Sequence, residues 1–150
     1  MEILPHFYIS SYDNIEESNF IHKKKIKHII HVSKKKKFLN IDKIEEIRIP
    51  IEYDEDDYSL EYINLDLYNY LHDTIEFIHE KLRENHSVLV LGYGYRQEID
   101  VIAIAYYMKY GRVTPQLGIF YLKTKKRNVF VPECVYEICL EKFYEDLHKI

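Results

Sequence analysis

The sequence predicts an α/β domain with a short, mostly parallel central sheet flanked by helices. Short apolar strands alternate along the chain with segments of helical periodicity. The most apolar strand, residues 87–91, leads through a short loop directly into a helix, which is typical of a central strand covered on both faces. The 150 residues suffice for one such unit, so we expect a single domain spanning residues 1–150.

In the first half of the chain, turn and capping residues separate short strands from helices. Asp13 is expected to cap a helix that runs to about Lys23 and turns Ile15 and Phe20 inward. Pro50 ends the third strand, before an acidic segment. The strands are expected at residues 6–10, 27–33 and 44–51, with a basic loop at residues 34–43.

The second half of the chain is mainly helical. Asn85-His86 ends a long amphipathic pattern, and Gly111 closes the helix that follows the apolar strand. Thr114-Pro115 begins another helix as a cap and a first-turn proline. The helices are expected at residues 60–82 and 99–111, from Thr114-Pro115 onward, and at residues 132–147.

Composition and charge limit the functions that the chain can have. The formal net charge of −4 argues against nucleic acid as a general partner. No apolar run is long enough to span a membrane, and the N-terminus lacks the pattern of a signal peptide, so we expect a chain that stays inside the cell, in the cytoplasm, the nucleus or both. The spacing of Cys134 and Cys139 suits a helix better than a zinc site, and we expect no cofactor.

The charged residues are clustered rather than evenly spread. Solvated loops are the ordinary explanation of such clusters, and a surface that binds a partner is the sharper one. Basic residues gather at Lys23, Lys24, Lys25 and Lys27, before the basic loop. The candidate partner-binding runs are Lys34, Lys35, Lys36 and Lys37 in the basic loop, and Asp54, Glu55, Asp56 and Asp57 in the acidic segment.

Five segments arrive in the order and at the spacing of one known family. ILPHFYISSYDN and KIKHIIHVS are similar to its opening strands, and IRIPIEYDED is similar to the segment that ends in its general-acid aspartate. IEFIHEKLRENHSVLVL and VIAIAYYMKYGRVTPQLGIFYLKTKKRNVFVP are similar to the elements before and after its signature loop. The chain thus resembles the dual-specificity phosphatases over nearly its whole length, and the resemblance implies their fold.

The resemblance also implies where the family's chemistry belongs. In active members a cysteine thiolate attacks phosphorus, an arginine and the loop amides hold the phosphate, and an aspartic acid protonates the leaving oxygen. Aligning the following helix on its Ala-Tyr-x-Met pattern puts Leu91 at the histidine position, Gly92 at the cysteine position and Glu98 at the arginine position. The acid position falls on Tyr53, with Asp54 next to it. The degenerate signature loop comprises Leu91, Gly92, Tyr93, Gly94, Tyr95, Arg96, Gln97 and Glu98.

These replacements oppose phosphatase chemistry. Gly92 supplies no nucleophile, and Glu98 would repel the phosphate that an arginine should hold. Glycine at the cysteine position also marks the pseudophosphatases of the serine/threonine/tyrosine-interacting type, to which the opening EILP is similar. Those relatives generally keep the arginine, so this chain departs from them at Glu98.

Several roles remain open for the loop side chains. The glycines of GYGY are interpreted as loop residues that tolerate positive φ, not as a dinucleotide fingerprint. Tyr93 and Tyr95 either close the old pocket or present an aromatic surface to a partner. Arg96 is either an ordinary surface residue or an anion ligand, and Glu98 either favours the helix dipole or pairs with Arg96 to fill the pocket.

The scattered histidines and tyrosines have structural explanations. His28 and His31 lie three apart in a strand and so face opposite sides, which argues against a metal site. An ordinary surface role is expected for His72 and His79. Core or core-edge packing is expected for Tyr62, Tyr68, Tyr70, Tyr106 and Tyr107.

The sequence therefore predicts a catalytically inactive pseudophosphatase that binds another protein as a module or scaffold. The resemblance implies phospho-signalling, with a kinase or a phosphoprotein as partner. One alternative is a phosphopeptide- or anion-binding module that uses Arg96 and the loop amides. A further alternative is an active phosphatase of unusual mechanism.

Overall fold

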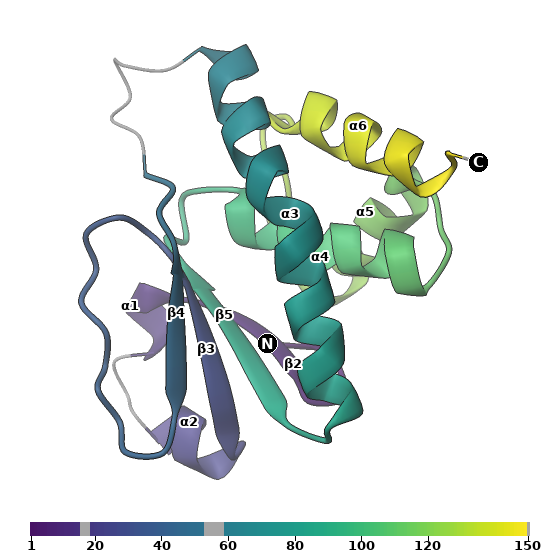
Figure 1. Ribbon diagram of the computed structural model, residues 1–150. Helices are drawn as coiled ribbons and strands as arrows, with labels where there is room; N and C mark the ends of the chain where they lie inside the picture. The colour runs from purple at the N-terminus through teal and green to yellow at the C-terminus, as the bar shows by residue number, and fades with distance from the viewer. Residues whose placement is uncertain (16–18, 53–58, 150) are drawn as a thin grey trace.

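A five-stranded sheet with helices on both faces forms the centre of the computed structural model, which describes residues 1–15, 19–52 and 59–149 (Figure 1). The strand order is β1-β2-β5-β3-β4, and the described pairs are parallel except that of β1 with β2. The strands are β1 (Glu2–Leu4), β2 (Phe7–Ser11), β3 (Ile26–Val32), β4 (Glu45–Ile49) and β5 (Ser87–Gly92). The predicted α/β fold with a short, mostly parallel sheet is confirmed.

α3, α4 and α5 begin at or next to the residues that the sequence indicated. The Ser59 side chain caps α3, the Thr114 side chain caps α5 ahead of Pro115, and Gly111 follows α4. The helices are α1 (Tyr12–Ile15), α2 (Asn19–Lys23), α3 (Leu60–Arg83), α4 (Glu98–Tyr110), α5 (Pro115–Lys125) and α6 (Glu137–Leu147). None of the described helices is long and apolar enough to cross a membrane.

β5 lies at the centre of the sheet and is buried on both faces. Val88 and Val90 join the larger apolar core, which α3, α4 and α6 cover. Leu89 and Leu91 face the other way, into a smaller core closed by α1 and α2. This alternation confirms the prediction that the strand is covered on both sides.

The candidate loop emerges from the carboxyl edge of the sheet. β2, β5, β3 and β4 run parallel, so their last residues meet at one edge, where Ser11 pairs with Gly92. Residues 93–97 connect β5 to α4 at this edge. Ligand sites of open α/β sheets lie at the carboxyl ends of the strands, so the fold places the loop where a site is expected.

The structure corrects the predictions for both ends of the chain. β1 was not predicted, and Asp13 lies within the first turn of α1 instead of capping a helix, because β2 continues to Ser11. The helix predicted to reach Lys23 is described as α1 and α2, and residues 16–18 lie outside the described residues.

The last helix begins at Glu137, not at Pro132. The preceding segment is tied to the start of α4, because the Gln97 amide donates to the Glu133 carbonyl at 2.9 Å and accepts from the Val135 N–H at 2.9 Å. Cys134 lies in this segment and Cys139 in α6, and both thiols are free.

Several aromatic and histidine side chains join the helices to one another. Tyr106 and Tyr107 are buried as predicted, but Tyr62 is 53% exposed, so packing was the wrong prediction for it. The two helix histidines are half-buried and join helices to one another. His72 contacts Asp146 of α6 at 2.8 Å, and His79 contacts the Tyr106 hydroxyl at 2.9 Å.

Candidate functional site

Space, rather than backbone conformation, favours glycine at residue 92 of the candidate loop. Neither Gly92 nor Gly94 has a positive φ, so the positive-φ interpretation is wrong. A Cβ atom at Gly92 would lie 2.5 Å from Cγ2 of Ile99, a buried residue in the first turn of α4. A Cβ atom at Gly94 would lie 3.2 Å from that of Ser11. The end of β5 therefore has no room for a side chain while Ile99 keeps its position.

A buried ion pair closes the helix end of the loop. The Arg96 Nε atom lies 2.7 Å from Glu98 Oε1, and the two side chains are only 15% and 5% exposed. Burial raises the pKa of Glu98, against the effect of the Arg96 charge. Burial alone would lower the pKa of Arg96, but the interactions with Glu98 and Tyr136 together outweigh it and raise that pKa. Among the roles left open for Arg96 and Glu98, the structure shows the ion pair between them.

The two loop tyrosines have different environments. The Tyr93 hydroxyl donates to Glu52 at 3.0 Å and lies 3.3 Å from the Ser33 hydroxyl. Tyr95 stacks on Tyr93 with ring centroids 5.5 Å apart and is 80% exposed. Tyr93 thus packs against the sheet edge, whereas the Tyr95 ring is exposed at the surface.

Glu52 connects the candidate loop to the ends of β3 and β4. It accepts a hydrogen bond of 2.7 Å from the Ser33 hydroxyl as well as that from Tyr93. Burial opposes ionisation of Glu52, but these hydrogen bonds outweigh it and lower the pKa of the carboxyl. The predicted acid position, Tyr53 and Asp54, and the acidic run Glu55 to Asp57 follow directly and lie outside the described residues.

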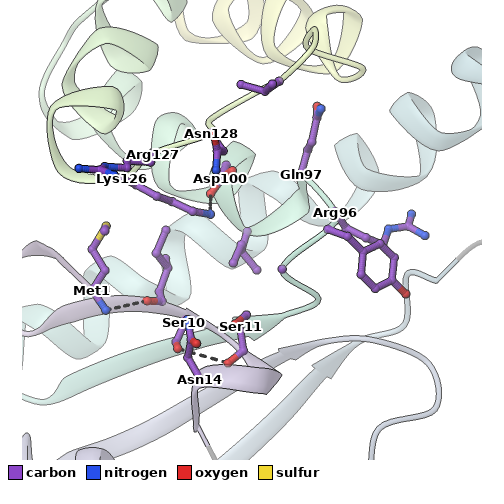
Figure 2. Close-up of a pocket in the computed structure, with 15 residues that line it drawn as sticks. Met1, Ser10, Ser11, Asn14, Arg96, Gln97, Asp100, Lys126, Arg127 and Asn128 are labelled. Carbon is purple, nitrogen blue, oxygen red and sulfur yellow. Dashed lines mark hydrogen bonds and ion pairs between the residues drawn. The ribbon is translucent and has the colours of Figure 1, made fainter.

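A polar cavity of 540 Å³ lies beside the loop (Figure 2). Ser10 and Ser11 line it from β2, and Gly94 lines it from the loop. Lys126 reaches in from the segment after α5 and contacts Asp100 of α4 at 2.6 Å. Burial raises the pKa of Asp100, and the Lys126 charge opposes this rise. The two charges that meet in the cavity therefore neutralise each other.

The predicted basic loop is held in place by side chains of β4. Arg48 donates to the Ser33 carbonyl at 2.7 Å and also to the Lys36 carbonyl. Glu46 accepts from the N–H groups of Leu39 and Asn40, each at 2.8 Å. Both β4 side chains thus fix the backbone of the loop, which leaves its lysines at the surface.

His31 supports this anchoring from beneath. Its Nε2 lies 2.7 Å from Glu46, and its Nδ1 lies 2.8 Å from the Tyr12 hydroxyl. A carboxylate only accepts, so the neutral ring donates from Nε2 and accepts from Tyr12 at Nδ1. His28 faces the opposite side of the sheet, as the strand spacing predicted. It contacts His86 at 2.8 Å. The described residues contain no group of three or more His, Cys, Asp or Glu arranged to hold a metal ion.

The contribution of His31 to the free energy of unfolding is expected to fall as the pH drops below 6.5, the ordinary pKa of histidine. Burial lowers the pKa of His31 in the folded state, so the unfolded chain binds the proton more readily and acid favours unfolding. Burial lowers the pKa of His28 and His79 as well, so His31→Gln should remove only part of the dependence. Urea unfolding at a series of pH values from about 8 to about 5 measures this dependence of the free energy of unfolding. The exposed His22→Gln variant is the control, and an unchanged slope in His31→Gln would contradict this assignment.

Solved structures resemble the whole chain. Human DUSP28 superposes with a TM-score of 0.76 at 18% sequence identity, covering 97% of this chain and 96% of that one. A mouse putative dual specificity phosphatase, solved with zinc tungstate, gives 0.78 at 18% identity, covering 97% and 86%. The fold is that of the dual-specificity phosphatases. The human tyrosine phosphatase-like serine/threonine/tyrosine-interacting protein shares this fold, with a TM-score of 0.72 at 20% identity and coverage of 98% and 95%.

At these identities the likeness to dual-specificity phosphatases establishes the fold alone. No protein-family model matches the chain, and no curated protein matches it. The sequence did not single out Ser33 or Ile99 as parts of the site, and it indicated Glu52 only as the start of the acidic run. Ile99 reads as an ordinary core residue, and the contacts of Ser33 and Glu52 link the ends of different strands, so no local pattern indicates them.

Proposed function

We propose that this chain is a catalytically inactive protein of the dual-specificity phosphatase fold, a pseudophosphatase that acts by binding another protein. The observation that carries the proposal is the position of Gly92. It ends the central strand at the carboxyl edge of the sheet, where the alignment assigns the nucleophilic cysteine. The Ile99 methyl group occupies the space that the Cβ atom of any other residue would need.

The ion pair of the loop supports the same proposal. A phosphate bound here would have to take Arg96 from Glu98, and a buried carboxylate would then face the phosphate dianion. This cost also weighs against the alternative of an anion-binding module. Titration with a phosphotyrosine peptide tests that alternative directly, since saturable binding that Arg96→Ala removes would favour it.

The resemblance suggests the class of partner. We propose a kinase or a phosphoprotein, held by the protein as a scaffold or competitor. The described parts of the candidate partner-binding set are the lysines of residues 34–37, of which Lys36 is half-buried, and the rings of Tyr93 and Tyr95. The acidic run from Asp54 to Asp57 belongs to the same proposal.

The parent protein is expected to release no phosphate from p-nitrophenyl phosphate or from a phosphotyrosine peptide. Gly92→Cys alone should not create activity, because Glu98 repels phosphate and Ile99 crowds the new side chain. An active cysteine phosphatase assayed in parallel is the positive control. Turnover by the parent that Asp54→Ala or Arg96→Ala abolishes would overturn the proposal, and activity in Gly92→Cys alone would show that the assigned loop register is wrong.

A further inference from the structure

A second cavity, of 700 Å³, lies apart from the signature loop. It opens between the described residues of α1 and α2 and the basic loop, next to the smaller apolar core of the sheet. Its apolar lining is Tyr12, Ile15, Ile21, Phe38, Leu39 and Ile41. We call this cavity the lysine groove, because Lys35, Lys36 and Lys37 complete its lining.

The wall formed by the basic loop is already ordered. Arg48 and Glu46 hold its backbone, and Phe38 stacks on the His31 ring with centroids 4.9 Å apart. The Lys36 Nζ atom lies 5.1 Å above the centre of the Tyr12 ring, which fixes its direction across the groove. A ligand entering the groove would therefore lose little free energy to ordering this wall.

The described lining of the groove is positively charged. No acidic residue is among the described residues that line it. Lys35 is 76% exposed at its side chain and lies 4.0 Å from Glu52, at the limit of an ion pair. Lys37 is exposed and makes no ion pair with any described residue. An apolar floor beneath exposed cations favours a ligand that has both apolar and anionic groups.

We propose that the lysine groove docks an acidic segment of a partner protein, in which an aliphatic or aromatic side chain is flanked by Asp or Glu. The apolar side chain enters the floor beside Leu39, and the flanking carboxylates pair with Lys35 and Lys37. A neutral peptide would leave these cations unpaired, and a basic one would be repelled. This inference rests on the proposed function as a binding module, and it names the surface and the chemistry of the partner.

Selection from a random peptide library displayed on phage tests the proposal on the full chain. The selected peptides should be rich in Asp and Glu around an apolar residue. Lys35→Glu with Lys37→Glu should weaken the best such peptide at least about tenfold in fluorescence polarisation. Lys123→Glu with Lys125→Glu, at exposed positions of α5, makes the same charge change and should leave the affinity unchanged.

A matched pair of variants tests the apolar part of the groove. Leu39 is 38% exposed and Leu117 of α5 is 42% exposed, so neither Leu→Ser change should unfold the chain. Leu39→Ser should weaken the selected peptide several-fold, whereas Leu117→Ser should not. Selection of neutral or basic peptides, or full affinity in the Lys35→Glu, Lys37→Glu variant, would overturn the proposal.

A membrane is the competing ligand for such a surface. Co-sedimentation with vesicles of phosphatidylserine and phosphatidylcholine is expected to show no binding that depends on Lys35 and Lys37. Vesicle binding lost in that variant, together with no peptide selected, would replace the partner by a lipid surface. Phosphatase turnover would refute the proposed function without touching the groove, so the two failures are distinguishable.

Discussion

Glu98→Gln is expected to lower the free energy of unfolding by about 3–5 kcal/mol. The change keeps the shape of the side chain but removes the charge that lies 2.7 Å from Arg96. The Arg96 side chain is only 15% exposed, so water cannot replace the lost carboxylate without opening the loop. Urea unfolding followed by circular dichroism measures the difference.

A control and a second measurement make this result specific. Glu141→Gln, at an exposed position of α6, should change stability by less than about 0.5 kcal/mol. Sulfate should stabilise the Glu98→Gln variant more than the parent, because Glu98 then no longer balances the charge of Arg96. Parent-like stability without a sulfate effect would mean that the ion pair does not close the loop.

The sheet and the long helices could be predicted because periodicity reports burial. Val88 to Leu91 are apolar without interruption because α3 and α4 cover one face and α1 and α2 the other. The apolar residues of α3 face the core. Ser59 caps the start of this helix, and Asn85-His86 follows its end. β1 was not predicted because it is defined by its pairing with β2. A short sequence pattern carries no information on such a contact between two segments.

The candidate site was predictable only in part. The alignment with the dual-specificity phosphatases indicated which residues form the loop. The pairing of Arg96 with Glu98 was among the roles left open for these two side chains. The contact between Tyr93 and Glu52 could not be predicted, since it joins two strand ends. The crowding at Gly92 also depends on where α4 turns, so the glycine looked like a flexible loop residue although it lies in a tightly packed strand end.

Gly92 and Ile99 should behave as one unit in mutagenesis. Gly92→Ala is expected to destabilise the protein by about 1–3 kcal/mol, because the new methyl group overlaps Ile99. Ile99→Ala alone is expected to cost about 2–5 kcal/mol through the cavity it leaves. In the double variant each change relieves the other, so the loss should fall short of the sum by about 0.5–3 kcal/mol in urea unfolding.

Gly94→Ala is the matched control for this cycle. Its new Cβ atom would lie 3.2 Å from Ser11 at an exposed loop position, so a smaller loss without coupling to Ile99→Ala is expected. Additive losses for Gly92→Ala and Ile99→Ala would show that the two residues do not share the same space. Coupling would instead mean that a cysteine at residue 92 needs a smaller residue at 99 before its sulfur can be placed. The packing of α4 on β5 would then oppose a thiol at this position, in support of the proposed loss of phosphatase chemistry.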